Sequence, residues 1–154
     1  MCGIAGIFGQ RSSSEPLADQ VKRMTETLSH RGPDDRGFWI NKDHNLAFGH
    51  RRLSILDLSK AGHQPMESSC GRFVMTFNGE IYNHLNIRKE LELKHGSILW
   101  RGTSDTETVV EGFSKWGIDK TLEKMVGMFA MAVWDKSKER LYLARDRIGE
   151  KPLY

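Results

Sequence analysis

The sequence predicts an α+β domain in which short apolar strands and amphipathic helices follow one another along the chain. Two observations support this prediction. The 154 residues include 38% hydrophobic and 28% charged residues, a composition typical of a globular domain with a sizeable core. The apolar residues form either short continuous runs, typical of strands, or patterns spaced three or four apart, typical of helices. No repeat or linker divides the chain, so one domain is expected.

The first half of the chain contains one predicted helix among four predicted strands. The apolar run Gly3–Phe8 indicates a buried strand almost at the N-terminus. A helix after Pro16 is indicated by apolar residues at spacings of 4, 3 and 4, namely Leu17, Val21, Met24 and Leu28. Further strands, separated by polar or glycine-containing turns, are expected at Phe38–Ile40, Leu46–His50 and Phe73–Phe77.

The second half begins with two predicted helices, Tyr82–Leu93 and Thr106–Trp116. In the second helix, one face is apolar and consists of Val109, Val110, Phe113 and Trp116. Two strands, Met128–Trp134 and Arg140–Ala144, follow, and the short polar loop between them predicts a hairpin. These patterns give the elements and their order but not how the layers stack.

Composition and charge exclude several classes of function. The 23 basic and 20 acidic residues are interspersed and give a net charge of +3, so we expect no nucleic-acid partner. No apolar run approaches the roughly 18 residues of a membrane span, and the N-terminus has no signal-peptide pattern. Two cysteines, Cys2 and Cys70, are too few for a disulfide framework, so a reducing cytoplasm is expected. The histidines and cysteines show no metal-ligand spacing, so no metal site is expected.

Cys2 is the first candidate for a chemical role. Removal of Met1, which is common before a small residue, would leave a thiol and a free α-amine on the same residue. An α-amine has an ordinary pKa of about 7.7–8.0 and accepts a proton near neutral pH. A nucleophile with an adjacent base is what acyl transfer requires. The alternative is a small apolar side chain at the start of a buried strand, and Cys2 alone does not decide between the two.

Asn78 and Gly79 directly follow the apolar run that ends at Phe77. An Asn-Gly pair is a common tight-hairpin sequence, but the chain from Ile81 onward has a helical pattern rather than a second strand. The pair also suits an oxyanion site, formed by the Asn78 amide and the Gly79 backbone N–H. Glycine at this position would let a substrate approach the backbone closely.

Two further segments have both a structural and a functional interpretation. Arg51 and Arg52 end a predicted strand and are either a solvated surface pair or a source of a guanidinium for a substrate carboxylate. Ser104 and Asp105 begin a helix, so they form either an ordinary N-terminal cap or, at Asp105, a site for a substrate ammonium. The segment 30–35 has the composition of a turn.

Together these segments belong to eight blocks that match one family in order over nearly the whole chain: MCGIAGIFG, HRGPDDRG, GHRRLSILDL, GHQPM, FNGEIYNH, TSDTE, GMFAMAVWD and LARDRIGEKPLY. The chain resembles the N-terminal glutaminase domain of asparagine synthetases. These enzymes are class II glutamine amidotransferases, a branch of the N-terminal-nucleophile hydrolases. The resemblance implies a four-layer αββα sandwich, with two stacked antiparallel sheets flanked by helices.

The resemblance also implies roles for individual residues. Cys2 matches the nucleophile, and Asn78 with Gly79 matches the oxyanion pair. Arg52 matches the residue that binds the α-carboxylate of glutamine. The two groups around the glutamine ammonium are matched by Glu80 and Asp105. One departure is Glu150, where the family usually has a small apolar residue, and the departure raises a question about local packing there.

The resemblance implies glutamine as substrate and ammonia as the product passed to a synthetase domain for ATP-dependent asparagine synthesis. Residues 1–154 are expected to be the amidotransferase domain alone, with the synthetase domain absent. The glutaminase half-reaction is expected to need no cofactor, whereas ATP and Mg²⁺ belong to the synthetase domain. A homodimer is compatible with the resemblance. Two alternatives remain, namely an amidotransferase with another ammonia acceptor and a non-catalytic glutamine-sensing module.

Overall fold

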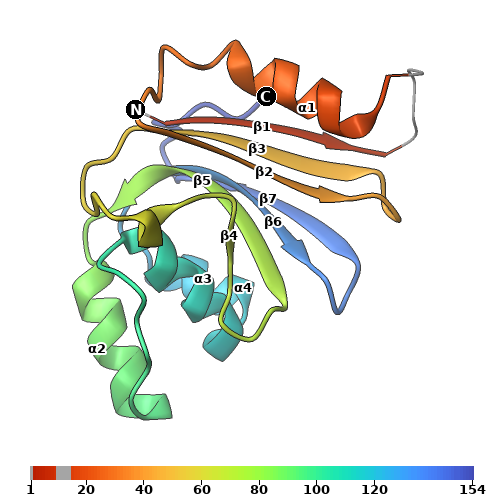
Figure 1. The fold of residues 1–154 in the computed structure, drawn as a ribbon. Helices are drawn as coiled ribbons and strands as arrows, with labels where there is room; N and C mark the ends of the chain where they lie inside the picture. The colour runs from red at the N-terminus through yellow and green to blue at the C-terminus, as the bar shows by residue number, and fades with distance from the viewer. Residues whose placement is uncertain (1, 10–14) are drawn as a thin grey trace.

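The computed structural model describes residues 2–9 and 15–154 as two antiparallel sheets stacked face to face, with helices on both outer sides (Figure 1). This arrangement confirms the predicted four-layer αββα sandwich. The expected removal of Met1 concerns a residue outside the described part of the chain.

The first sheet contains three strands in the order β1-β3-β2. They are β1 (Gly3–Phe8), β2 (Asp35–Asn41) and β3 (Leu46–Arg52). Helix α1 (Leu17–Glu26) covers the outer face of this sheet (Figure 1). Pro16 occupies the N-cap, where its missing N–H costs no helical hydrogen bond. The buried face of α1 consists of Leu17, Val21 and Thr25, whereas Met24, expected on that face, is 40% exposed.

The second sheet has four strands in the order β4-β5-β6-β7. They are β4 (Met66–Glu67), β5 (Phe73–Ile81), β6 (Gly127–Asp135) and β7 (Arg140–Arg145). Its outer face is covered by α2 (His84–His95), α3 (Asp105–Trp116) and α4 (Ile118–Lys124) (Figure 1). A 3₁₀ turn at Lys60–Gly62 precedes β4. Since β4 is only two residues long, it pairs with β5 at Val74 and Met75, and the rest of that edge has no strand neighbour among residues 2–9 and 15–154.

Three clusters of apolar side chains fill the spaces between the four layers. In β3, Ala47 packs on α1 while its neighbours Leu46 and Phe48 face the second sheet, as the alternation of a strand requires. Phe48 packs with Trp134 of β6 in the cluster between the sheets. The largest cluster joins β5 and β6 to the helices and includes Phe113 of α3. Burial of these side chains holds the layers together.

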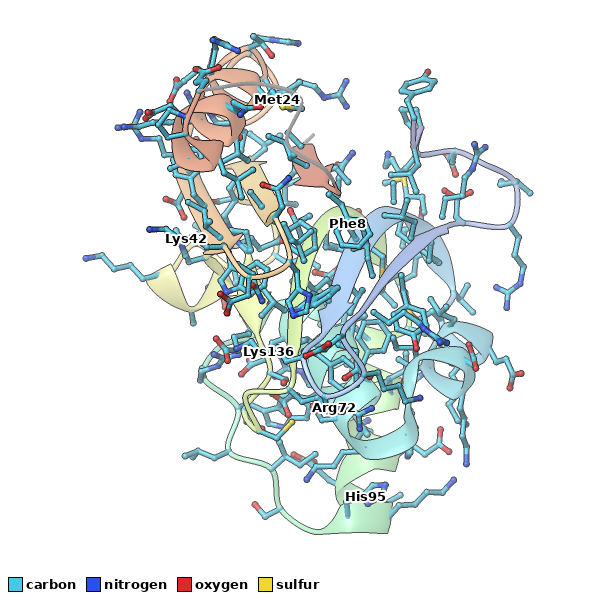
Figure 2. The ribbon with its side chains drawn as sticks, turned by 90° about the vertical axis from the view of Figure 1, so that its right-hand side faces the viewer. Phe8, Met24, Lys42, Arg72, His95 and Lys136 are labelled. Carbon is cyan, nitrogen blue, oxygen red and sulfur yellow. The ribbon has the colours of Figure 1, made fainter. Side chains whose placement is uncertain are left out.

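The two ends of the sandwich differ. At one end, Phe8 extends from β1 toward the second sheet (Figure 2), and its ring centroid lies 6.1 Å from that of Trp134. At the other end, the start of β1 and the last residues of β5 lie close together in the fold (Figure 1). The first end therefore carries a contact between aromatic rings of the two sheets, and the second carries the N-terminal residues.

Most predicted elements are present, and the differences have local causes. β5 does not end at Phe77, because pairing with β6 continues to Ile81, opposite Gly127. Asn78 and Gly79 therefore lie inside a strand and not after it. Neither β4 nor α4 was predicted, since two and seven residues are too short for a clear periodic pattern. Within the described ranges, no helix is long and apolar enough to cross a membrane.

Candidate active site

A pocket that is open to solvent lies where β1 begins and β5 ends. All of the site residues predicted from sequence line this one cavity, although they come from four separate segments of the chain. They are Cys2, Arg52, Asn78, Gly79, Glu80 and Asp105. The structure therefore brings the whole predicted set together.

Cys2 is held just before the start of β1 by the segment that follows β3. Its Sγ accepts a hydrogen bond from the backbone N–H of Leu53 at 3.4 Å, and the Leu53 carbonyl lies 3.7 Å from the same sulfur. The Cys2 carbonyl accepts a hydrogen bond from Arg31 Nε at 3.3 Å. These contacts fix the thiol beside Arg52, the last residue of β3.

The surroundings of Cys2 disfavour the thiolate in the absence of substrate. Burial raises the pKa of the Cys2 thiol, and the Leu53 N–H and the Arg52 charge offset only part of this effect. A buried thiol with a raised pKa needs a base that takes its proton during attack. The arrangement thus suits a neutral thiol with an adjacent proton acceptor, and not a preformed thiolate.

The edge of β5 next to the cavity carries the proposed oxyanion donors. Phe129, opposite Gly79, directs its carbonyl and N–H toward Asp146, with N···O distances of 2.8 and 3.2 Å. Gly79 and Phe129 are therefore a pair without mutual hydrogen bonds, so the Gly79 N–H points away from β6. Its neighbours on that edge, the N–H groups of Phe77 and Ile81, bond to Gln64 and Asp105. Among the described residues, no side chain accepts a hydrogen bond from Gly79, whose N–H faces the cavity.

Glycine at position 79 is required by the sheet itself. A Cβ there would lie 2.2 Å from the carbonyl oxygen of Met128 and 2.7 Å from Phe129 Cα in the neighbouring strand. No real Cβ contact is this short, so a larger residue would force β5 and β6 apart. From the sequence, the glycine was explained by the close approach of a substrate. The structure adds a second reason, which is the close packing of β5 against β6.

Arg51 and Arg52 face opposite sides of β3. Arg51 pairs with Glu26 of α1 on the outer face, whereas Arg52 lines the cavity and donates to the backbone carbonyls of Asp57 and Ser59. Both guanidinium groups are largely buried, at 9% and 7% exposure for the whole residues. Only Arg52 is therefore placed to meet a ligand in the cavity.

The acidic residues of the cavity come from β5 and from the first turn of α3. Asp105 is buried, and its carboxylate accepts hydrogen bonds from the N–H groups of Ile81 and Thr106, both at 2.8 Å. Burial raises the pKa of Asp105, and these two hydrogen bonds offset only part of the effect. Glu80 follows Gly79 and is half-buried beside it. A ligand ammonium beside Asp105 would stabilise the charged carboxylate.

Several residues of the site were not predicted from sequence. Gln64 and Lys151 line the cavity and are both 4% exposed, and His50 is completely buried beside the site. All three lie in the sequence blocks that match the family, and this was the one sequence signal that could have identified them. Their spacing from other polar residues does not suggest a catalytic or binding role. Glu150, the departure from the family pattern, is exposed, and its N–H bonds to Asp146 Oδ1 at 2.7 Å.

Within residues 2–9 and 15–154, no group of three or more His, Cys, Asp or Glu side chains is close enough to hold a metal ion. The second cysteine, Cys70, is exposed in the turn between β4 and β5. Its Sγ lies 3.3 Å from Ser114 Oγ and 3.4 Å from Ser68 Oγ. Cys70 is not among the residues that line the cavity.

Comparison with known proteins gives a consistent result. A family model described as a glutamine amidotransferase domain matches residues 1–154. The chain is 41% identical over 156 residues to "Asparagine synthetase [glutamine-hydrolyzing] 2" of Bacillus subtilis, covering 100% of this chain and 20% of that protein. It is 36% identical over 170 residues to "Putative asparagine synthetase [glutamine-hydrolyzing] 2" of Methanocaldococcus jannaschii, covering 100% of this chain and 32% of that protein.

A solved structure supports the fold independently. The glutamine phosphoribosylpyrophosphate amidotransferase of B. subtilis superposes with a TM-score of 0.70 at 20% sequence identity, over 93% of this chain and 37% of that chain. At this identity the similarity establishes the fold alone. In all three comparisons, this chain covers less than two fifths of the relative's length.

Proposed function

The chain belongs to the glutamine amidotransferase domain family, and from this premise we propose that it hydrolyses the side-chain amide of glutamine with Cys2 as nucleophile. One observation carries the proposal. The thiol of Cys2, the open N–H of Gly79 and the guanidinium of Arg52 share one cavity although they are up to 77 positions apart in sequence. These are the groups that an acyl transfer from an amino-acid amide needs.

The first step is attack of Cys2 Sγ on the amide carbon. Once Met1 is removed, the α-amine of Cys2 accepts the thiol proton, directly or through one water, as the S–C bond forms. The carbonyl oxygen gains the negative charge and is stabilised by the Asn78 amide and the Gly79 N–H. Collapse breaks the C–N bond, the α-ammonium returns its proton to the leaving nitrogen, and ammonia departs.

The second step releases the acyl group. Water attacks the thioester carbon and gives a proton to the α-amine, and the same oxyanion donors stabilise the second tetrahedral intermediate. Breaking of the C–S bond gives glutamate, and the thiolate is reprotonated. The chain supplies every base and donor in this sequence, so the glutaminase half-reaction as written uses no metal or organic cofactor.

Glutamine is oriented by its α-substituents. The Arg52 guanidinium suits the α-carboxylate, because two parallel N–H donors match its two oxygens. Asp105 and Glu80, which line the same cavity, receive the α-ammonium. When both groups are bound, the side-chain amide is directed toward Cys2 and the Gly79 N–H. Binding of the α-substituents thus orients the amide for attack.

The ammonia is passed to a synthetase domain that uses ATP and Mg²⁺ to make asparagine from aspartate. This part of the proposal is supported by the names of the two relatives and by their length, of which this chain covers 20% and 32%. We place the reaction in the cytoplasm, where a reducing environment keeps Cys2 as a thiol. An enzyme with another ammonia acceptor would share everything described for the cavity.

The experiment is an assay of glutamate and ammonia with the chain in which Met1 has been removed. We expect both products in equal amounts, at a rate insensitive to ATP and aspartate, and no asparagine. Failure of a folded, fully processed chain to release glutamate would exclude the catalytic proposal and favour a glutamine-sensing module. Binding of glutamine by calorimetry would then separate that module from a chain with no affinity for glutamine.

A further inference from the structure

The backbone of Phe77 lies immediately before Asn78 on the edge of β5 that β4 leaves open. Backbone groups two residues apart in a strand point to the same side, so the Phe77 N–H and C=O and the Gly79 N–H all point toward this edge. A strand edge without a neighbour is normally free to move or to be solvated. Any movement of the Phe77 backbone would shift the two oxyanion donors that follow it.

Two buried side chains contact the backbone of Phe77, one at its N–H and the other at its C=O. The Phe77 N–H donates to Gln64 Oε1 at 2.7 Å, and His50 Nε2 lies 3.0 Å from the Phe77 carbonyl oxygen. Gln64 is 4% exposed and His50 is 0% exposed. Both hydrogen bonds are therefore shielded from water, where they hold their geometry more strongly than at a surface.

The same two side chains connect the oxyanion strand to the other walls of the cavity. Gln64 Nε2 donates to Thr106 Oγ1 at 3.4 Å, next to Asp105 in the first turn of α3. His50 stands two residues before Arg52 on β3. These two contacts therefore add to the direct Ile81–Asp105 hydrogen bond in joining the strand of the oxyanion donors to the segments that carry Asp105 and Arg52.

The hydrogen bond of His50 also sets its protonation. Because a carbonyl accepts, Nε2 must carry the proton, and Nδ1 is then an acceptor; within the described residues it has no partner. Burial lowers the pKa of His50 to about 4. His50 therefore stays neutral in the working range of pH and acts as a fixed donor, not as an acid or base.

We propose that His50 and Gln64 are positioning residues, which hold the Phe77 backbone so that Asn78 and Gly79 point at the oxyanion. The inference rests on the proposed glutaminase function. Neither side chain needs to touch the substrate. Their contribution appears in the transition state, where a displacement of donors by a fraction of an ångström is most costly.

The test compares variants that remove one contact each. His50→Leu removes the donor and Gln64→Met removes the acceptor, while His50→Gln keeps an N–H donor at similar reach. Thr76→Val is the matched control, because Thr76 is 1% exposed on the same strand and also bonds to β3, through the Gly49 carbonyl at 3.4 Å, but not at the Phe77 backbone. Each variant is characterised by thermal unfolding, by kcat and KM for glutamine, and by the alkylation rate of Cys2 with iodoacetamide.

Iodoacetamide separates positioning from general damage, because its reaction with a thiol forms no oxyanion. We expect His50→Leu and Gln64→Met to lower kcat by about 10- to 100-fold, with KM and the alkylation rate within about threefold of the wild-type values. His50→Gln should recover at least part of the loss, and Thr76→Val should keep the wild-type kcat.

The inference is overturned if folded His50→Leu and Gln64→Met variants keep the wild-type kcat, or if kcat and alkylation fall together. If His50→Leu does not fold, His50→Gln and Gln64→Met decide in the same way. A wild-type chain without glutaminase activity would contradict the proposed function instead. Wild-type activity with insensitive variants contradicts only the positioning role.

Discussion

Cys2 and Cys70 lie near the two ends of β5, and their surroundings differ. A comparison of thiol acidity alone would select Cys70, and not Cys2, as the nucleophile. Burial raises the pKa of Cys2. At Cys70 partial burial acts in the same direction, but hydrogen bonds with Ser114, Ser68 and the backbone of Arg72 outweigh it and lower the pKa. The exposed turn therefore holds the more acidic thiol, and the cavity holds the less acidic one.

The difference teaches which features make a nucleophile for amide hydrolysis. Within the part of the chain that the structure describes, Cys70 has hydroxyl neighbours and solvent but lies outside the cavity that Cys2 shares with the other site residues. Cys2 shares its cavity with the open N–H of Gly79 and with Arg52, and under the proposed mechanism its α-amine, once Met1 is removed, serves as an internal base. Reactivity toward glutamine should follow these partners, whereas reactivity toward a small alkylating agent should follow the pKa.

The largest expected effect comes from exchanging the thiols one at a time. Cys2→Ala should abolish glutamate release, because no other described thiol lines the cavity. Cys70→Ser should keep the wild-type rate, since its replacement also bonds to Ser68 and Ser114. Glutamate release by each purified, folded variant provides the measurement. A Cys2→Ala variant with near wild-type activity would remove the basis of the comparison.

Next in size is the loss of an oxyanion donor. Asn78→Ala should lower kcat by about 10²–10³, with a smaller change in KM, because the donor acts mainly on the transition state. Steady-state kinetics at saturating glutamine measures the effect, and thermal unfolding controls for damage to β5. A tenfold rise in KM with unchanged kcat would make Asn78 a binding residue.

The two arginines at the end of β3 provide an internal control for substrate binding. Removing Arg52 should cost roughly 2–5 kcal/mol of binding, since a buried substrate carboxylate loses its partner. Arg51→Ala should affect stability instead, because Arg51 pairs with Glu26 on the opposite face. Glutamine KM and the midpoint of unfolding distinguish the two outcomes. Equal KM values for the two variants would contradict the assignment of Arg52.

The smallest expected effect is the pH dependence of alkylation at the two thiols. Each is measured alone, Cys70 in Cys2→Ser and Cys2 in Cys70→Ser, by iodoacetamide labelling followed by mass spectrometry. Because the thiolate is the reacting form, labelling of Cys70 should rise at lower pH than that of an ordinary thiol and labelling of Cys2 at higher pH. The reverse order would mean that the Cys2 site is more polar than its burial indicates.

The sequence allowed the strands and helices with clear apolar periods to be predicted, and Gly3–Phe8 is correct to the residue. The prediction was wrong where polar site residues interrupt the apolar pattern of a strand. Asn78 and Glu80 face the cavity, so the apolar pattern of β5 stops at Phe77 although pairing continues to Ile81. The Asn-Gly hairpin was weighed and not favoured, but local preference also does not register the pairing with β6 that continues through these residues.

The candidate site residues were predicted from sequence motifs, but only the three-dimensional structure shows that they line one cavity. Alternation in a strand predicts that Arg51 and Arg52 face opposite sides, but not which side carries α1. His50 and Gln64 have no sequence feature that suggests their role, since both act on Phe77 across 27 and 13 residues. Such long-range contacts depend on the stacking of layers, which periodicity does not give.

The central claim is that Cys2 attacks glutamine with its own α-amine as base, and one measurement tests it most directly. Preparations with different fractions of Met1 removal are quantified by intact mass spectrometry, and their glutaminase rates are measured without ATP. We expect the rate to be proportional to the processed fraction, because retained Met1 converts the α-amine into an amide that is not a base near neutral pH. Full activity in a preparation that retains Met1 would contradict this account.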